Sequence, residues 1–191
     1  MSKILTTQLT GLLQRIEKGE EESIGDTARL LAQAGIGEGI VYFACFGEFA
    51  GVAINALTGV DPFKKALLWA PNVILNSTDR IILFTRSDSD TEALALARKL
   101  SADFVPFSAV ASEVASMENE LSELATTYIS LKIRGGILPH TEKLGERIVF
   151  PHLIAALYVY EALKMEYDEI IEDEGDFEEE APTERHASPF A

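Results

Sequence analysis

The stretch DRIILFTRSDSDTEALALARKL, residues 79–100, decides the fold of this chain. It begins with a short continuous apolar run, which is typical of a strand buried on both faces of a parallel sheet. The polar turn RSDSD follows, and apolar residues then recur at helical spacing in TEALALARKL. A strand, a polar turn and a helix in this order form part of a β-α-β unit, the building block of parallel sheets.

The same alternation extends outward in both directions. Further strands are predicted at 40–45, 66–69, 104–107 and 128–133, and helices at 5–16, 23–34, 47–57, 110–124 and 150–167. Gly19 is expected to separate the first two helices, and the apolar last helix is expected to be buried. We therefore predict an α/β three-layer sandwich with a five-stranded parallel sheet. Its N-terminal and C-terminal helices are expected to pack against the core or a dimer interface.

Composition divides the chain into two parts. Residues 1–167 have the hydrophobic content of one globular domain, whereas residues 168–191 are rich in Asp and Glu and poor in large apolar side chains. Such a segment does not bury enough apolar surface to offset the entropy of ordering it. We expect a domain over 1–167 and a disordered acidic tail over 168–191.

Charge and cysteine content exclude several classes of protein. The net charge of −15 excludes a nucleic-acid groove and attachment to an anionic membrane, because both require a basic surface. Cys45 is the single cysteine, so no disulfide forms within the chain. No apolar run reaches the ~18 residues of a membrane span, and the N-terminus has no signal-peptide pattern. These features predict a cytoplasmic protein.

The loop after the strand at 79–85 carries candidate anion ligands. Ser87, Ser89 and Thr91 place hydroxyl groups beside the start of a helix, where free N–H groups and the helix dipole favour an anion. Arg86 adds a charged donor. The sequence therefore allows a phosphate site in this loop.

A purely structural reading of the same loop remains open. Asp88 and Asp90 place carboxylates where a phosphate would bind and would repel it. The spacing from Ser89 to Glu92 fits a capping box, in which side chains satisfy the first N–H groups of the helix. Together with Glu48, the two aspartates also offer oxygen ligands for Mg²⁺ or Ca²⁺, although no residues show a recognised metal-ligand spacing.

Two glycine motifs flank the first predicted strand. In CFGEFAG, Gly47 follows the strand and allows either close approach of a ligand to the backbone or a tight strand-to-helix turn. Glu48 beside it supplies a candidate catalytic carboxylate. GIGEG at 35–39 precedes the strand, whereas a dinucleotide-binding loop follows its strand, so we interpret it as a helix stop. We expect no cofactor.

Basic and imidazole groups are predicted near the same edge. Arg134 belongs to a basic loop after the fifth strand, where it would bind an anion or pair with Asp88 and Asp90. His152 begins the last helix, where a histidine acts as a proton carrier or as a cap or interface residue.

Several of these segments resemble the sugar isomerase (SIS) domain family. Residues 79–100 resemble the family pattern at the start of its phosphate-binding helix, with Thr85 and Ser87 at the two serine positions. IVYFACFGEFAG is similar to the family's first strand and glycine turn. Asp88 stands where the family has a loop glycine. The resemblance covers most of residues 1–167 and implies a flavodoxin-like fold, a bound phosphosugar and a homodimer.

A narrower resemblance concerns the ends of the domain. TTQLTGLLQRIE, ARLLAQA and FPHLIAALYVYEAL resemble a small group of bacterial SIS-like proteins, some of them described as phosphoheptose isomerases. Those isomerases use a Glu and a His as acid and base. The candidates here are Glu48, by its position, and His152, although the resemblance places the catalytic histidine further along the helix, near Leu157. Together with the loop arguments above, the expected ligand-binding residues are Gly47, Thr85, Arg86, Ser87, Ser89, Thr91 and Arg134. The alternative hypothesis is a non-catalytic dimeric regulatory or protein-interaction module with a degenerate sugar-phosphate site.

Overall fold

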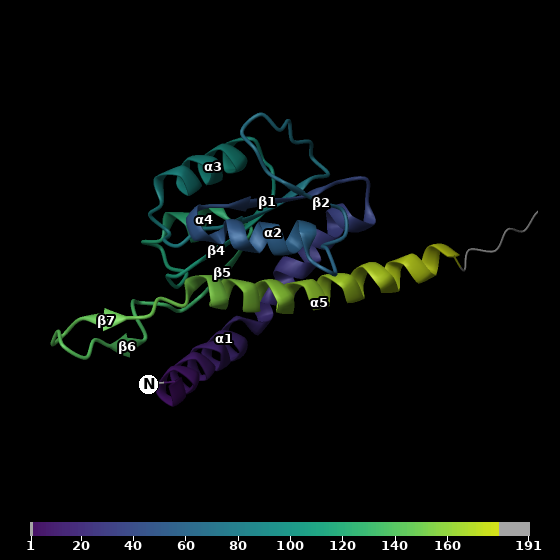
Figure 1. Cartoon of the computed structure of the whole chain (residues 1–191). Helices are drawn as coiled ribbons and strands as arrows, with labels where there is room; N and C mark the ends of the chain where they lie inside the picture. Colours follow the sequence, from purple (N-terminus) through teal and green to yellow (C-terminus); the bar gives the residue numbers. More distant parts are fainter. Residues whose placement is uncertain (1, 180–191) are drawn as a thin grey trace, which may run out of the picture.

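A five-stranded parallel sheet forms the centre of the protein, as predicted (Figure 1). The computed structural model describes residues 2–179. The strands are β1 (Val41–Cys45), β2 (Ala66–Leu68), β3 (Arg80–Phe84), β4 (Phe107–Ala111) and β5 (Thr127–Ser130), in the order β2-β1-β3-β4-β5. The chain thus leaves β1 toward one side and returns from β2 to β3 on the other. This reversal creates a switch point at the carboxyl ends of β1 and β3, where open α/β sheets bind ligands.

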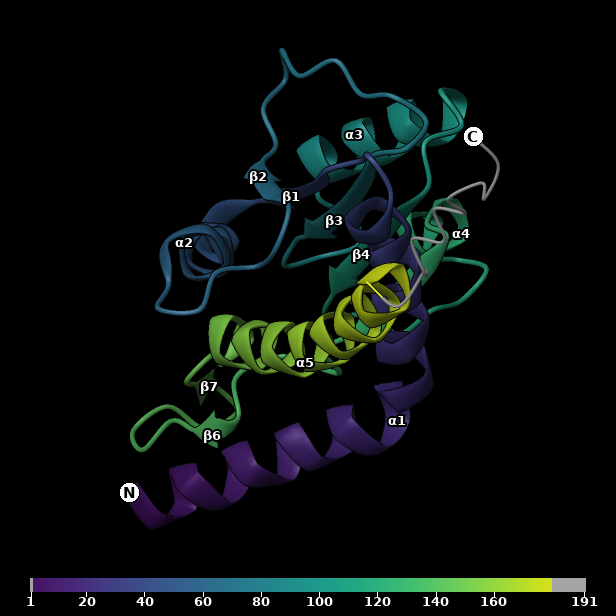
Figure 2. The same cartoon turned by 90° about the vertical axis from the view of Figure 1, so that its right-hand side faces the viewer.

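Helices cover both faces of the sheet and complete the three predicted layers (Figure 2). Alternation along β3 divides the core, because Ile82 and Phe84 face one layer while Ile81 and Leu83 face the other. On the first face lie α1 (Ser2–Ile36), the short 3-10 turn η1 (Gly47–Phe49), α2 (Ala50–Thr58) and α5 (His152–Glu179). On the second lie α3 (Thr91–Ala102) and α4 (Glu120–Leu124).

The predicted break at Gly19 is wrong, because α1 is continuous through this residue. A Cβ atom at Gly19 would collide with Nζ of Lys132, so a glycine leaves room for that ammonium group. Lys132 forms an ion pair of 2.8 Å with Glu20, whose carboxylate also accepts the N–H of Ser130 at the end of β5. The glycine therefore serves packing between α1 and β5.

The predicted strand at 104–107 and helix at 110–124 are misplaced. Phe104 has a positive φ of 54° and belongs to the turn after α3, so the strand begins later, at Phe107. All five residues of β4 are buried between β3 and β5, and small side chains such as Ala109 and Ala111 fit that position. The helix is limited to the five residues of α4.

The end of the domain also differs from its prediction. Helix α5 continues to Glu179, so the expected boundary at residue 168 falls within a helix, and residues 180–191 lie outside the described residues. The basic loop contains a two-stranded hairpin, β6 (Leu138–Pro139) and β7 (Arg147–Ile148). Within residues 2–179, no helix combines the length and apolar character that crossing a membrane requires.

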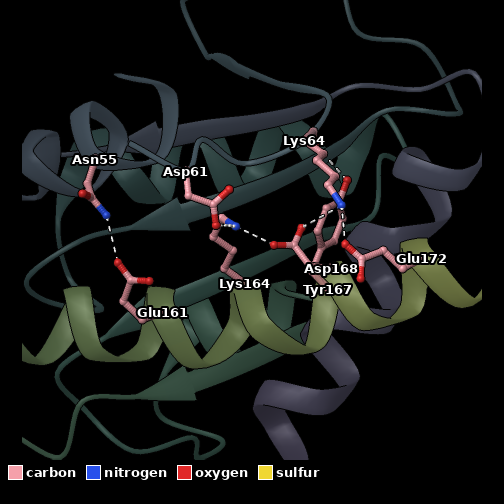
Figure 3. A network of polar contacts seen from close by, with 8 residues as sticks. All are labelled: Asn55, Asp61, Lys64, Glu161, Lys164, Tyr167, Asp168 and Glu172. Atoms are coloured by element: carbon pink, nitrogen blue, oxygen red, sulfur yellow. Dashed lines mark hydrogen bonds and ion pairs between the residues drawn. The ribbon is translucent and has the colours of Figure 1, made fainter. Parts of the chain in front are cut away.

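An ionic network fixes the second half of α5 to the segment between α2 and β2 (Figure 3). The ammonium group of Lys164, 5% exposed, binds the carboxylates of Asp61, at 2.6 Å, and Asp168. Burial alone would lower the pKa of Lys164, but hydrogen bonds to both carboxylates raise it above its ordinary value. Lys64 binds Glu172 at 2.9 Å. These contacts hold the helix beyond Tyr167, where the sequence predicted disorder.

Candidate functional site

Polar residues gather at the carboxyl edge of the sheet, around the switch point. The loop after β1 supplies Gly47 and Glu48, and the loop after β3 supplies the segment 86–89. The segment after β4 adds Ser112 and Glu113, and α5 begins at this edge with His152. Four separate segments of the chain therefore contribute side chains to one edge.

The β3–α3 loop binds a carboxylate from the same chain. Glu113 Oε1 accepts a hydrogen bond from the Ser87 hydroxyl at 3.2 Å, and Glu113 Oε2 accepts the N–H of Asp88 at 2.9 Å. The Ser87 hydroxyl also lies 2.9 Å from that of Ser89. A hydroxyl and a main-chain N–H converging on one oxyanion is an arrangement that phosphate sites also use. The loop therefore has the donors of an anion site, with Glu113 at the anion position.

Two buried hydroxyl groups donate hydrogen bonds to the backbone of this loop. Thr85 is fully buried, and its hydroxyl donates to the carbonyl of Ser87 at 3.3 Å. Ser112, also buried, donates its hydroxyl to the carbonyl of Arg86. Thr85 and Ser112 thus stabilise the backbone conformation of the loop.

The start of α3 is capped by Asp90 and not by Ser89. The Asp90 carboxylate accepts the N–H groups of Glu92, at 3.0 Å, and Ala93, at 2.9 Å. The predicted capping box is therefore wrong by one residue, although the structural role of an acid at this point is as expected. Thr91 is the exposed first residue of the helix.

Two acids lie close together in the loop. Asp88 is partly buried beside Glu113, and burial, followed by the charge of Glu113, raises the pKa of the Asp88 carboxyl above its ordinary value. A further anion entering this loop would increase the same repulsion.

Arg86 joins the two candidate acid-base residues. Its Nε lies 3.5 Å from Glu48 Oε1, and its Nη2 lies 3.3 Å from His152 Nδ1. The guanidinium also lies over the ring of Phe150, 5.5 Å from its centroid, and this ring stacks on His152. The structure thus brings Glu48, Arg86 and His152 into one cluster beside the Ser87 loop.

The contact with Arg86 constrains the imidazole of His152. A guanidinium only donates hydrogen bonds, so Nδ1 accepts and the ring proton lies on Nε2. Burial of His152, at 5% exposure, and then the nearby charge of Arg86 lower the pKa of the ring below its ordinary value. His152 is therefore neutral near pH 7, and its proton-accepting nitrogen is engaged.

Arg134 lies on an adjacent cleft and not in the Ser87 loop. This cleft, about 840 Å³, lies between α1 and the segments after β4 and β5, and its lining includes Arg15, Lys132, Arg134, Arg147 and Glu113. Among the side chains that the structure describes, Arg134 forms no ion pair, so the expected pairing with Asp88 or Asp90 is absent there. Glu113 connects the cleft to the loop.

The sequence did not point to Glu113. It was placed inside a predicted helix because β4 was placed too early, and a residue in a helix does not lie at the strand edge. The apolar run FSAVA followed by Ser112 and Glu113 carries the missed signal, since a strand over this run puts both residues at the carboxyl edge.

In the part of the chain that the structure describes, no three His, Cys, Asp or Glu residues gather as metal ligands. Glu48 is paired with Arg86, and Asp90 accepts hydrogen bonds from amides at the start of α3. Burial raises the pKa of Cys45 to about 12, which keeps this thiol protonated.

The arrangement of sheet and helices is that of the SIS domain. The chain superposes on the sugar isomerase domain of an RpiR transcription factor from Sphaerobacter thermophilus with a TM-score of 0.58. The match covers 93% of this chain and 97% of that one, and the two sequences are 14% identical. It also matches the Vibrio vulnificus NanR protein complexed with ManNAc-6P, with 13% identity, 93% of this chain and 64% of that chain covered and a TM-score of 0.61. A hypothetical protein from Methanococcus jannaschii, whose crystal structure infers a function of 3-hexulose-6-phosphate isomerase, matches with 14% identity, 93% and 90% coverage and a TM-score of 0.52.

Sequence comparison then places the chain in a particular family. The profile described as "Domain of unknown function (DUF2529)" matches residues 1–171, and the chain belongs to this family. "Uncharacterized protein YwjG" of Bacillus subtilis (strain 168) is 34% identical over 177 residues, which cover 91% of this chain and 99% of that protein. This member of the DUF2529 family therefore has the fold of SIS domains.

Proposed function

We propose that this protein binds a phosphorylated sugar or a related small anion at the carboxyl edge of its sheet. The observation that carries the proposal is the convergence of the Ser87 hydroxyl and the Asp88 N–H on a single carboxylate, because a loop that binds one oxyanion has donors placed for another. The ManNAc-6P complex of the NanR protein and the hexulose-phosphate function inferred for the M. jannaschii protein support this class of ligand. Gly47, Ser89, Thr91 and, from the cleft, Arg134 complete the proposed site.

A thermal-shift screen tests ligand binding. Saturation at about 100 times Kd stabilises a native protein by about 2.7 kcal/mol, which raises the melting temperature by roughly 5–11 °C at this size. Inorganic phosphate and the phosphates of pentoses, hexoses and heptoses would be compared. Ser87→Ala should lose the shift, and Ser77→Ala, a change in an exposed serine before β3, should retain it. No shift with any phosphate in the unmodified protein would refute the proposal.

The finer proposal is isomerase chemistry of the phosphoheptose type. The Glu48 carboxylate, 38% exposed, would take a proton from one sugar carbon, and the protonated acid would return it to the neighbouring carbon. His152 would assist at the sugar oxygens through its Nε2–H. Interconversion of aldose and ketose phosphates, followed by NMR, should be abolished in Glu48→Gln.

A second candidate function is a non-catalytic dimeric regulatory or protein-interaction module. The observation that favours it is that Arg86 contacts both candidate acid-base groups, the Glu48 carboxylate at 3.5 Å and His152 Nδ1 at 3.3 Å, so both already have a partner within the chain. This function predicts ligand binding without turnover, and a dimer in analytical ultracentrifugation. Turnover of any bound sugar phosphate would exclude it.

A further inference from the structure

Glu113 fills the anion position of a loop to which it does not belong. It follows β4, whereas the donors that it accepts come from the loop between β3 and α3. Each of its two carboxylate oxygens takes one donor, Ser87 Oγ for one and the Asp88 N–H for the other. An incoming phosphate would need these same donors, so the two groups compete for one position.

Electrostatic repulsion makes it unfavourable for the Glu113 carboxylate and a phosphate to occupy the loop at the same time. The Asp88 carboxyl already lies partly buried beside Glu113, and the raised pKa of Asp88 reflects this crowding after burial itself. A phosphate would bring up to two further negative charges to the same loop, and like charges at a shared site oppose ionisation. Binding of an anion therefore requires Glu113 to leave or to lose its charge.

The neighbouring cleft offers Glu113 a second environment. Glu113 lines this cleft of about 840 Å³ together with Arg15, Lys132 and Arg134. Arg15 and Arg134 form no ion pair with any side chain in the described part of the protein. A carboxylate turned from the loop toward the cleft would exchange two loop donors for guanidinium groups, which bind carboxylates well.

We propose that Glu113 is the selectivity residue of this site: an anionic group binds the Ser87 loop only by displacing the Glu113 carboxylate toward the cations of the cleft. This inference rests on the proposed function and adds the residue that controls it. A ligand therefore binds only if its anionic group has a higher affinity for the loop donors than the Glu113 carboxylate has. Free phosphate then binds weakly, and sugar phosphates bind through additional contacts of the sugar.

Titration calorimetry with inorganic phosphate tests this proposal. Glu113→Ala should bind phosphate about tenfold more tightly than the unmodified protein, a change of about 1.4 kcal/mol. Glu113→Gln should lie between them, because the amide oxygen still accepts one bond but carries no charge. Glu118→Gln, a change in an exposed acid of the same segment, is the matched control and should change nothing. Adding Ser87→Ala to Glu113→Ala should abolish the gain.

A second measurement, made without ligand on the folded variant, tests the contact between Glu113 and Asp88 directly. Carboxyl titration by NMR should show the pKa of Asp88 falling toward its ordinary value in Glu113→Gln, since one of the causes that raise it is removed. An unchanged Asp88 pKa in a folded variant would contradict the proximity on which the proposal depends.

The outcomes separate the two proposals. Equal phosphate affinity in the unmodified protein and Glu113→Ala would overturn the role of Glu113 and leave the proposed function standing. Binding by Glu113→Ala, with none by the unmodified protein for phosphate or any sugar phosphate, would overturn the proposed function. It would also overturn the displacement of Glu113 by a ligand, because the carboxylate would then block the loop permanently. No binding by either protein would overturn both.

Discussion

Replacement of Lys164 by methionine should destabilise the protein strongly, because the ammonium group is buried between two carboxylates (Figure 3). Removing one partner of a buried pair costs about 3–5 kcal/mol. Two features reduce that value here: Asp61 is 83% exposed and regains water, and Lys64 lies 4.0 Å from Asp168. We expect a loss of about 2–3 kcal/mol in the free energy of unfolding.

Urea denaturation followed by circular dichroism measures this loss, and the melting temperature should fall by roughly 4–12 °C. Lys99→Met, a change in an exposed lysine on α3, is the matched control and should have little effect. The double variant Lys164→Met with Asp168→Leu should recover most of the stability, because it removes the uncompensated carboxylate as well. A loss below about 0.5 kcal/mol in the single variant, or no recovery in the double variant, would refute the reasoning.

The same pair predicts a pH dependence. The pKa of Lys164 is raised on folding, so its contribution is fully present below the ordinary lysine pKa of about 10.4. It is lost as the pH rises through the higher pKa of the folded state. The stability difference between Lys164→Met and the unmodified protein should therefore be constant from pH 7 to about pH 10 and shrink above it.

Three further predictions concern local contacts. Asp90→Ala should cost about 1 kcal/mol by removing the cap of α3, whereas Asp90→Asn should be nearly neutral in the same melt. The pKa of His152, which is lowered in the folded protein, should rise in Arg86→Met when it is measured by NMR titration. Because this pKa is lowered on folding, the contribution of His152 to the free energy of unfolding is present above about pH 6.5 and is lost as the pH falls below that value. Gly11→Ala should stabilise α1 by about 0.5–1 kcal/mol. Gly19→Ala should not, because its Cβ displaces a paired lysine; equal gains at both sites would contradict that packing.

Sequence patterns predicted the parts of the fold where local and tertiary preferences agree. The strand and turn at 79–91 and the glycine turn after β1 carry both an apolar run and a turn signal, and the structure has both elements. The pattern failed where a residue serves a distant contact. Gly19 looks like a helix stop, yet it makes room for Lys132, more than a hundred residues away.

The candidate site was predictable only in outline. The sequence placed Ser87 and Arg86 at the correct edge, because the carboxyl ends of parallel strands share one edge. It gave no indication that Glu113 binds the Ser87 loop or that Arg86 joins Glu48 to His152, since these contacts depend on side-chain directions set by packing. The helical content of residues 168–179 was missed because composition alone does not reveal ion pairs such as Lys64 with Glu172.

The most direct test of the central claim is an amide NMR titration of the unmodified protein with a sugar phosphate. If the β3–α3 loop binds the phosphate, the N–H signals of Asp88 and Ser89 should show the largest shifts. Smaller shifts at Gly47 and Glu113 should fit the same Kd. Signals around Lys164, on the far part of α5, should stay in place. Shifts confined to residues away from the carboxyl edge, or none at millimolar ligand, would contradict the assignment of this edge as an anion site.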